Sequence, residues 1–250
     1  MDSLLYLKGD PLDLQEIIEK FSEGLVYVDT HTETITLNSR TKVPYLVGLK
    51  TMHEVDVVKE MVSWWKQKFP SDFTTSDSVK VSFPYPNLKK DFCDLVFSSD
   101  GQSLSNPEWA IEVKHISFLG DNGKNNDYNV QKMLSPYLKD RSLIHDIHKL
   151  KSNPIGRKQA VIGYCFNYDF LICDEALKIH PEHTLKVNEM RKVCKKNNDK
   201  SGELNVKDIV DFANQIFTTH NLAKNLKQIE FKGAWRHPCG GNGTIFAWEV

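Results

Sequence analysis

The sequence predicts an α/β fold, and the main evidence is the order of six segments in the middle of the chain. The first segment has apolar residues at steps of three and four, which is typical of an amphipathic helix. Three short segments rich in β-branched and aromatic residues predict strands. A second helical pattern and a continuous apolar run complete the order helix, strand, strand, strand, helix, strand. The six segments are Thr51–Phe69, Val79–Phe83, Asp91–Phe97, Trp109–His115, Val130–Leu150 and Gln159–Phe166.

The second helical segment of this core is interrupted. Pro136 is expected to start a new helix with Ser135 as its N-cap. Leu143, Ile147 and Leu150 recur at helical spacing and predict the buried side of that helix.

Shorter elements are predicted on both sides of the core, which spans about residues 51–166. Before it, residues 1–48 are expected to form a helix, Leu12–Phe21, and two strands, Leu25–Asp29 and Thr32–Leu37. After it, residues 167–250 are expected to form a helix broken at Pro181, a second helix and two terminal strands, namely Asp174–Cys194, Asn205–His220, Leu226–Trp235 and Thr244–Val250. No repeat or linker divides the chain, so a single domain over residues 1–250 is predicted.

Composition and charge limit the classes of function. Hydrophobic residues make up 40% and charged residues 26% of the 250 residues, which is typical of soluble globular proteins. The net charge of −1 means that nucleic-acid binding has to come from local basic patches. No signal-peptide pattern and no apolar run near the ~20 residues of a membrane span are found. Five scattered cysteines without a Cys-x-x-Cys pair predict a reduced, cytoplasmic protein.

Two carboxylates and one ammonium group fall on neighbouring predicted strands. Glu112 and Lys114 point to the same face because side chains alternate along a strand, and Asp94 lies beside them if the strands form a hairpin. Buried charges have to be paired or bind a metal. Mg²⁺ prefers oxygen ligands, and Asp94, Glu112 and the backbone carbonyl of Val113 supply them. The alternative is a solvated strand face with a Glu–Lys pair of little value.

Two further carboxylates are open to more than one interpretation. Glu54 lies on the apolar stripe of the first helix and is a candidate third acidic ligand. The run Thr51-Met52-His53-Glu54 is also a capping box, in which Glu54 closes the first turn. Asp91 is a candidate metal ligand if the strand register is shifted.

Basic residues near the acidic group are candidates for contact with a nucleic-acid backbone. Lys89 and Lys90 come directly before the Asp94 strand, and Lys124 lies in a Gly- and Asn-rich loop after the Lys114 strand. Arg141 and Lys149 belong to the second helical segment of the core. Such residues also occur as ordinary solvated surface.

The order of elements, with Asp94 and the triplet Glu112-Val113-Lys114, resembles the core of the PD-(D/E)XK nuclease superfamily, and most closely its restriction-endonuclease branch. The resemblance covers about residues 51–166 and implies a restriction-endonuclease-like core, with a central mixed β-sheet flanked by helices. Asp94 matches the strand aspartate of the family, Glu112 its second carboxylate and Lys114 its lysine. Glu54 matches the helix glutamate of part of the superfamily. The chain departs from the pattern at Cys93, where the family often has proline.

The resemblance implies a Mg²⁺-dependent endonuclease that hydrolyses DNA phosphodiester bonds, with Mn²⁺ able to substitute. A type II restriction-type enzyme on duplex DNA is expected, with a role in defence. DNA, a second copy in a homodimer and an associated DNA methyltransferase are its expected partners, with no membrane involved. Two alternatives remain: a nuclease acting on RNA or on branched or modified DNA, and a non-catalytic nucleic-acid-binding module that retains the fold.

Overall fold

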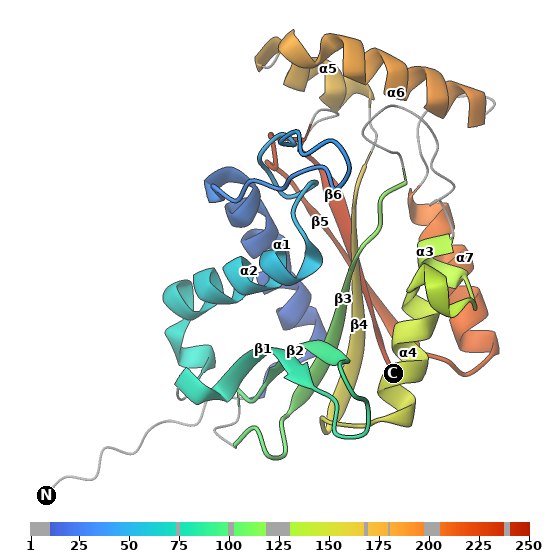
Figure 1. Ribbon diagram of the computed structural model, residues 1–250. Helices are drawn as coiled ribbons and strands as arrows, with labels where there is room; N and C mark the ends of the chain where they lie inside the picture. Colours follow the sequence, from blue (N-terminus) through green and yellow to red (C-terminus); the bar gives the residue numbers. More distant parts are fainter. Residues whose placement is uncertain are drawn as a thin grey trace, which may run out of the picture.

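One six-stranded mixed sheet organises the protein (Figure 1). The computed structural model describes residues 11–73, 76–99, 103–118, 131–167, 170–179, 181–197, 206–237 and 241–250. The strands lie in the order β1-β2-β3-β4-β6-β5. Their bounds are Val79–Pro84 for β1, Phe92–Phe97 for β2, Trp109–His115 for β3, Lys158–Phe166 for β4, Lys224–Phe231 for β5 and Gly243–Glu249 for β6.

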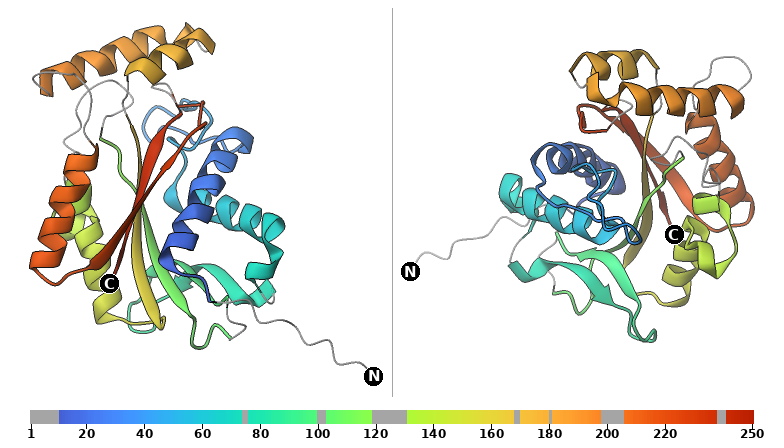
Figure 2. Two further views of the ribbon diagram at one scale, coloured as in Figure 1. Left: turned by 180° about the vertical axis from the view of Figure 1, so that it is seen from behind. Right: turned by 45° about the horizontal axis from the view of Figure 1, so that its top comes forward.

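Helices cover both faces of the sheet (Figure 2). On one face α1 packs against β5 and β6, and α2 packs against β1, β2 and β3; on the other, α4 packs against β3 and β4, and α7 against β5. The short α3 lies beside α4, while α5 and α6 lie beyond one end of the sheet. The helices are α1 (Leu14–His31), α2 (Glu54–Lys68), α3 (Gln131–Leu134), α4 (Leu143–Ser152), α5 (Phe170–Ile179), α6 (Thr184–Asn197) and α7 (Val206–Thr219). None of the helices in the described ranges is long and apolar enough to span a membrane.

The strand pairings confirm the predicted order of core elements. β1, β2 and β3 form an antiparallel meander. The chain then passes through α4 and returns as β4, which is parallel to β3. The terminal strand β6 lies antiparallel between β4 and β5. The protein therefore has an α/β fold with a mixed, open sheet.

Strand β3 divides the core into two parts. Ile111 and Val113 belong to the apolar cluster under α1 and α2, whereas Ala110 and Ile116 belong to the cluster under α4 and α7. Because side chains alternate along a strand, the intervening Glu112 and Lys114 face the α4 side.

The predicted strands Leu25–Asp29 and Thr32–Leu37 are wrong. Residues 14 to 31 form the single helix α1, in which Leu25 and Val28 extend the buried stripe that begins at Leu14. The β-branched residues in this stretch favoured strand locally, but burial against α2 and the sheet outweighs that preference. After α1, Leu37 makes only an isolated bridge with Pro44.

Two expectations for the later helices also need correction. Ser135 and Pro136 do not start a helix; α4 begins at Leu143, and the N-cap is Ser142, whose hydroxyl accepts the His145 N–H at 3.3 Å. Leu143, Ile147 and Leu150 are fully buried, as predicted. The helical spacing of Ile209, Phe212, Ala213 and Ile216 predicts the buried side of α7. The observed side is rotated, because Val210 and Phe217 are buried with Ala213 while Phe212 is 53% exposed. The loop with Lys124 lies outside the described residues.

Candidate functional site

The β2–β3 hairpin carries Asp94 beside the neighbouring strand. The paired register runs from Phe97 opposite Trp109 to Leu95 opposite Ile111. At the next position the Asp94 carboxylate, Oδ2, accepts the backbone N–H of Val113 at 2.8 Å. This hydrogen bond between the Asp94 side chain of β2 and the backbone of β3 holds the Asp94 carboxylate next to Glu112 and Lys114.

Glu112 is a buried carboxylate with two close partners. Its Oε1 accepts a hydrogen bond from the hydroxyl of Tyr85 at 2.6 Å and lies 2.7 Å from Nζ of Lys149. Burial raises the pKa of Glu112 well above its usual range, and repulsion by Asp94 and Asp146 raises it further, against the opposing effect of Lys149. Glu112 is therefore under electrostatic strain when ionised.

Asp94 shares this excess of negative charge. Burial raises the pKa of Asp94, although the hydrogen bond from Val113 N–H and the charge of Lys114 act in the opposite direction. When both carboxylates are ionised they repel each other, and a cation bound between them would reduce that repulsion.

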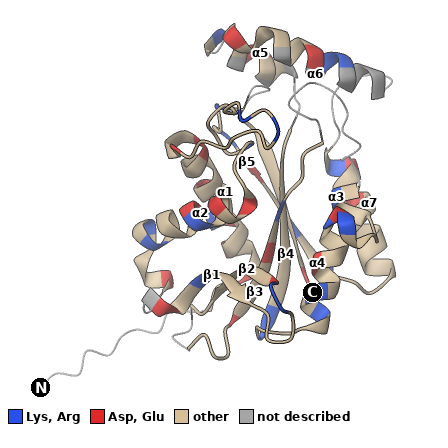
Figure 3. Ribbon diagram, in the orientation of Figure 1, with Lys and Arg blue, Asp and Glu red and all other residues tan. Residues whose placement is uncertain are grey.

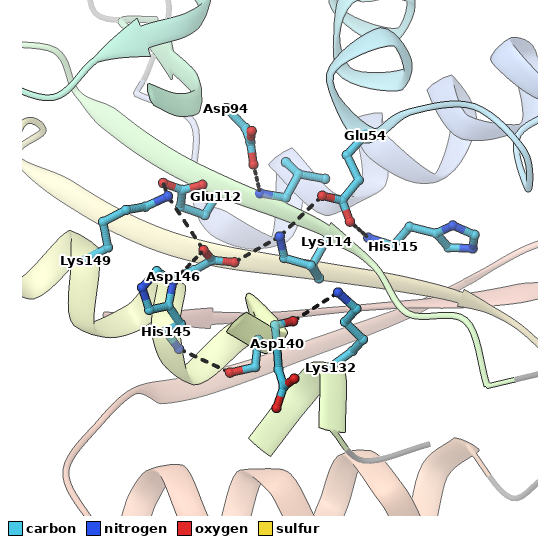
Figure 4. Close-up of polar contacts among 12 residues, drawn as sticks. Glu54, Asp94, Glu112, Lys114, His115, Lys132, Asp140, His145, Asp146 and Lys149 are labelled. Carbon is cyan, nitrogen blue, oxygen red and sulfur yellow. Dashed lines mark hydrogen bonds and ion pairs between the residues drawn. The ribbon is translucent and has the colours of Figure 1, made fainter. Parts of the chain in front are cut away.

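Lys114 lies between carboxylates from two different helices (Figure 4). Its Nζ is 3.3 Å from Oε2 of Glu54 on α2 and 3.2 Å from Oδ2 of Asp146 on α4, and the lysine is only 7% exposed. Burial alone lowers the pKa of Lys114, but Asp146, Glu54, Asp94 and Glu112 together outweigh burial and raise it. Lys114 is thus a permanent ammonium group at neutral pH and not a free base.

Glu54 does not close a capping box. The N-cap of α2 is His53, which makes no side-chain cap hydrogen bond. The carboxylate of Glu54 instead reaches β3, where Oε1 accepts the backbone N–H of His115 at 3.0 Å and Oε2 contacts Lys114. The first turn of α2 is therefore tied to the end of the strand that carries Glu112 and Lys114.

Asp146 and Tyr85 belong to the site but were not predicted from the sequence. Asp146 lies three residues after Leu143 and four before Leu150, so a carboxylate interrupts the buried stripe of α4, and its side chain is 5% exposed. A carboxylate in an apolar helix stripe indicates a buried charge, so the sequence did contain a signal for Asp146. Tyr85 follows β1 in a turn between two prolines, and nothing in the sequence indicates that its hydroxyl reaches Glu112.

The four carboxylates and two lysines of this cluster line one cleft of about 930 Å³, whereas Tyr85 is not part of its lining. Basic residues line it from the β1–β2 hairpin, which carries Lys90, and from α4 and the turn before it, which carry Lys139, Arg141 and Lys149. Figure 3 shows the Lys and Arg positions along the chain in blue. Of the predicted basic contacts, Lys90, Arg141 and Lys149 line the cleft; Lys89 is exposed and is not part of the lining. Asp91 is an exposed residue of the cleft wall. The lining residues are Glu54, Val55, Ser82, Lys90, Asp91, Phe92, Asp94, Glu112, Lys114, Leu138, Lys139, Arg141, His145, Asp146 and Lys149.

The donor set fits a hard divalent cation only in a partly hydrated form. Within the described ranges no group of three or more His, Cys, Asp and Glu side chains is arranged to hold a metal ion. Mg²⁺ commonly uses one or two carboxylates and keeps several waters, which matches the pair Asp94 and Glu112. Four carboxylates, Glu54, Asp94, Glu112 and Asp146, face the ammonium groups of Lys114 and Lys149. Around these two ammonium groups the carboxylates are in excess, which favours binding of a cation at this point of the cleft.

The fold and the cleft together define an α/β protein with a mixed six-stranded sheet and a buried cluster of carboxylates and lysines. No protein-family model, curated protein or solved structure matches this chain.

Proposed function

We propose that the protein is a Mg²⁺-dependent endonuclease that hydrolyses phosphodiester bonds in DNA. One observation carries the proposal: Asp94 on β2 and Glu112 on β3 are neighbouring carboxylates with raised pKa values, and the buried ammonium group of Lys114 lies in the same cleft. Hydrolysis of a phosphodiester needs a cation to neutralise the phosphoryl oxygens and an oriented water. The cleft supplies residues for both tasks.

The arrangement of core elements supports the resemblance to the PD-(D/E)XK nucleases. The helix α2, the meander β1-β2-β3, the helix α4 and the parallel strand β4 follow one another as that resemblance implies. Asp94, Glu112 and Lys114 line one cleft, and Glu54, the counterpart of the helix glutamate, contacts Lys114. Cys93, at the position where the family often has proline, is buried, and its thiol donates to the carbonyl of Ile111 at 3.4 Å.

The roles of the residues follow from their protonation and burial. Asp94, Glu112 and the carbonyl of Val113 would hold Mg²⁺ or Mn²⁺, which supplies charge neutralisation and acidifies water. Lys114 stays protonated, so it acts by donating hydrogen bonds to the water or the phosphate oxygens and by stabilising negative charge. Glu54 and Asp146 hold the ammonium group of Lys114 in place.

The finer assignment rests on the resemblance. Type II restriction activity on duplex DNA, a homodimer reading a two-fold site and an accompanying methyltransferase remain proposals. Light scattering with and without DNA tests the dimer, and a monomer in both conditions contradicts it.

The experiment for the activity is incubation with plasmid and long linear DNA in Mg²⁺, Mn²⁺ or EDTA. We expect nicking or cutting that needs the metal and is lost in Asp94→Ala and Lys114→Ala. Glu230→Ala is the matched control, because Glu230 is an exposed carboxylate on β5. Cutting that persists in both site variants, or in EDTA, overturns the assignment.

One observation favours the alternative of a non-catalytic nucleic-acid-binding module. Lys149 already places an ammonium group 2.7 Å from Glu112, so the acidic pair is partly neutralised without a metal. Thermal melting distinguishes the two functions: a metal-binding enzyme is stabilised by Mg²⁺, whereas the module binds nucleic acid without any effect of the metal.

A further inference from the structure

Exposed apolar side chains lie on both walls of the acidic cleft. On the β2 wall, Phe92 is 49% exposed; on the opposite wall, the turn between α3 and α4 presents Leu138, which is 70% exposed. Tyr137, next to Leu138, is 66% exposed. Single exposed apolar residues are common on protein surfaces. Here Phe92 and Leu138 line one cleft from two separate segments, and Tyr137 is the neighbour of Leu138 outside that lining.

Cations accompany these apolar groups on each wall. Lys90 lies two residues before Phe92, and Lys139 and Arg141 follow Leu138; all three line the cleft. The ammonium group of Lys139 is 5.8 Å from the ring centre of Tyr137. Alternating cations and flat apolar side chains is the chemistry that binds unstacked nucleotides, whose phosphates are anionic and whose bases have π-faces. On these walls the three cations outnumber the one carboxylate of Asp91, which favours a polyanion with accessible bases over an apolar partner.

The turn that presents Tyr137 and Leu138 is held by polar contacts on its inner side. Lys132 Nζ donates to the carbonyl of Asp140 at 3.0 Å (Figure 4). The hydroxyl of Ser135 donates to the Asp140 carboxylate, and that of Ser142 donates to the Ser135 carbonyl at 2.5 Å. The turn is thus fixed without burying its apolar side chains.

The backbone is strained on both walls as well. Ser82, Lys90 and Arg141 line the cleft and have φ values of 56°, 71° and 47°, in the left-handed region that residues other than glycine rarely adopt. Such conformations persist where the surrounding structure imposes them, and they cluster at ligand-binding sites. The positions of the Lys90 and Arg141 side chains thus depend on a costly backbone geometry.

We propose that the two walls bind unstacked nucleotides, so that the DNA bound in this cleft is single-stranded or locally opened at the bond to be cut, in place of the intact duplex that the resemblance implies. Phe92 stacks on one base and the Tyr137–Leu138 pair contacts another, while Lys90, Lys139 and Arg141 bind the adjoining phosphates. Phe92 and Asp94 both line the cleft and are two residues, or roughly 7 Å, apart along β2. A base stacked on Phe92 therefore adjoins the phosphate at the acidic pair.

This inference rests on the proposed function for the position of the cut, but its binding part is tested without cleavage. The probes are a labelled single-stranded oligonucleotide, a matched duplex and a duplex with a short unpaired gap, all in EDTA. Fluorescence anisotropy gives the affinity, and 2-aminopurine in the single strand reports stacking. The wild-type protein is expected to prefer the single strand and the gapped duplex over the matched duplex.

Two variants remove the apolar contacts. Phe92→Ala and the double variant Tyr137→Ala/Leu138→Ala are each expected to weaken single-strand binding by roughly 10-fold, the scale of one lost stacking contact. Phe92→Tyr and Tyr137→Phe keep the rings and retain binding. Phe212→Ala is the matched control, because Phe212 is 53% exposed and belongs to α7, which packs against β5 and carries none of the residues that line the cleft.

The outcomes separate this inference from the proposed nuclease activity. If DNA is cut in an Asp94-dependent way but binding and 2-aminopurine fluorescence are the same in Phe92→Ala and wild type, the stacking inference is wrong and the nuclease stands. If no DNA is cut but binding depends on Phe92 and Tyr137, the stacking inference stands and the nuclease is wrong. Tighter binding of the matched duplex than of the single strand also contradicts the inference.

Discussion

The ammonium group of Lys149 on α4 lies 2.7 Å from Oε1 of Glu112 on β3. The same lysine is 3.6 Å from Asp146, and its side chain is 14% exposed. Burial lowers the pKa of Lys149, but Glu112 and Asp146 outweigh it and raise the pKa, so the group is charged at neutral pH. The helix that crosses between β3 and β4 therefore supplies a built-in cation to one of the two proposed metal ligands.

Removing this cation is predicted to strengthen metal binding. Lys149 and Mg²⁺ compete for the charge of Glu112, so Lys149→Gln should bind Mg²⁺ more tightly by roughly 10-fold, or about 1.4 kcal/mol. Isothermal titration calorimetry measures the change. Lys151→Gln, on the same helix but bonded to the Asn221 carbonyl, serves as the control. Weaker Mg²⁺ binding by Lys149→Gln would show that Lys149 supports the site rather than competing with the metal.

Neutralising Asp94 is predicted to stabilise the metal-free protein. Burial raises the pKa of Asp94 in the folded state, so the folded protein holds this proton more tightly than the unfolded chain. The stability that depends on Asp94 therefore falls as the pH rises above the unfolded pKa. Asp94→Asn keeps an oxygen for the Val113 N–H. At neutral pH its free energy of unfolding should be higher than that of the wild type by about 1 kcal/mol, with a higher melting temperature.

Two measurements check the Asp94 prediction. The higher stability of Asp94→Asn should disappear in acid, where Asp94 of the wild type is protonated in both the folded and the unfolded protein. Mg²⁺ should raise the melting temperature of the wild type but not that of the variant. A variant that melts lower than wild type at neutral pH contradicts the prediction.

Lys114→Met is predicted to destabilise the fold. It leaves Glu54 and Asp146 without their shared ammonium group, and breaking a buried pair in this way costs about 3–5 kcal/mol. Lys68→Met is the contrast, because Lys68 and Glu23 are each about half exposed and such a pair contributes at most about 1 kcal/mol. Urea unfolding measures both. If both variants lose the same free energy of unfolding, the buried ion pairs of Lys114 contribute no more to stability than an exposed pair.

Glu54 is predicted to act by positioning Lys114 and β3 rather than by starting α2. Glu54→Gln retains an oxygen for the His115 N–H but loses the charge that faces Lys114. We expect at least about 10-fold lower nuclease activity, the scale of a misplaced catalytic group, with little change in melting temperature. Asp56→Asn is the control and should leave activity unchanged. Asp56 lies in the same turn of α2, and the ion pair described for it is with Lys59 at 3.9 Å.

The affinity for Mg²⁺ is predicted to rise with pH. Burial raises the pKa values of both Asp94 and Glu112, so protons compete with the metal above the usual titration range of carboxyl groups. Binding between about pH 5 and pH 8 should strengthen and release protons, which calorimetry in buffers of different ionisation enthalpy detects. A flat pH profile in this range contradicts the raised pKa values.

Local pattern alone determined most of the elements of the core. The spacing of apolar residues in α2 and the β-branched residues of β1 to β4 predicted their type and order, because those patterns reflect the period of each element. The same reasoning failed over 25–37, where Val and Thr favoured strand. Whether such residues form a helix depends on what the rest of the chain buries against them, and that is not encoded locally.

For the site, the sequence by itself placed Asp94, Glu112 and Lys114 on neighbouring strands, since side chains alternate at every residue and a short loop makes a hairpin. It left Glu54 undecided between a helix cap and the site, and it did not single out Asp146 or Tyr85. Only the tertiary structure decided these, because α2 and α4 approach β3 from opposite faces of the sheet. The ammonium group between Glu54 and Asp146 is a contact among residues about 30 to 90 positions apart in the chain, and packing of the layers, rather than any local spacing, brings them together.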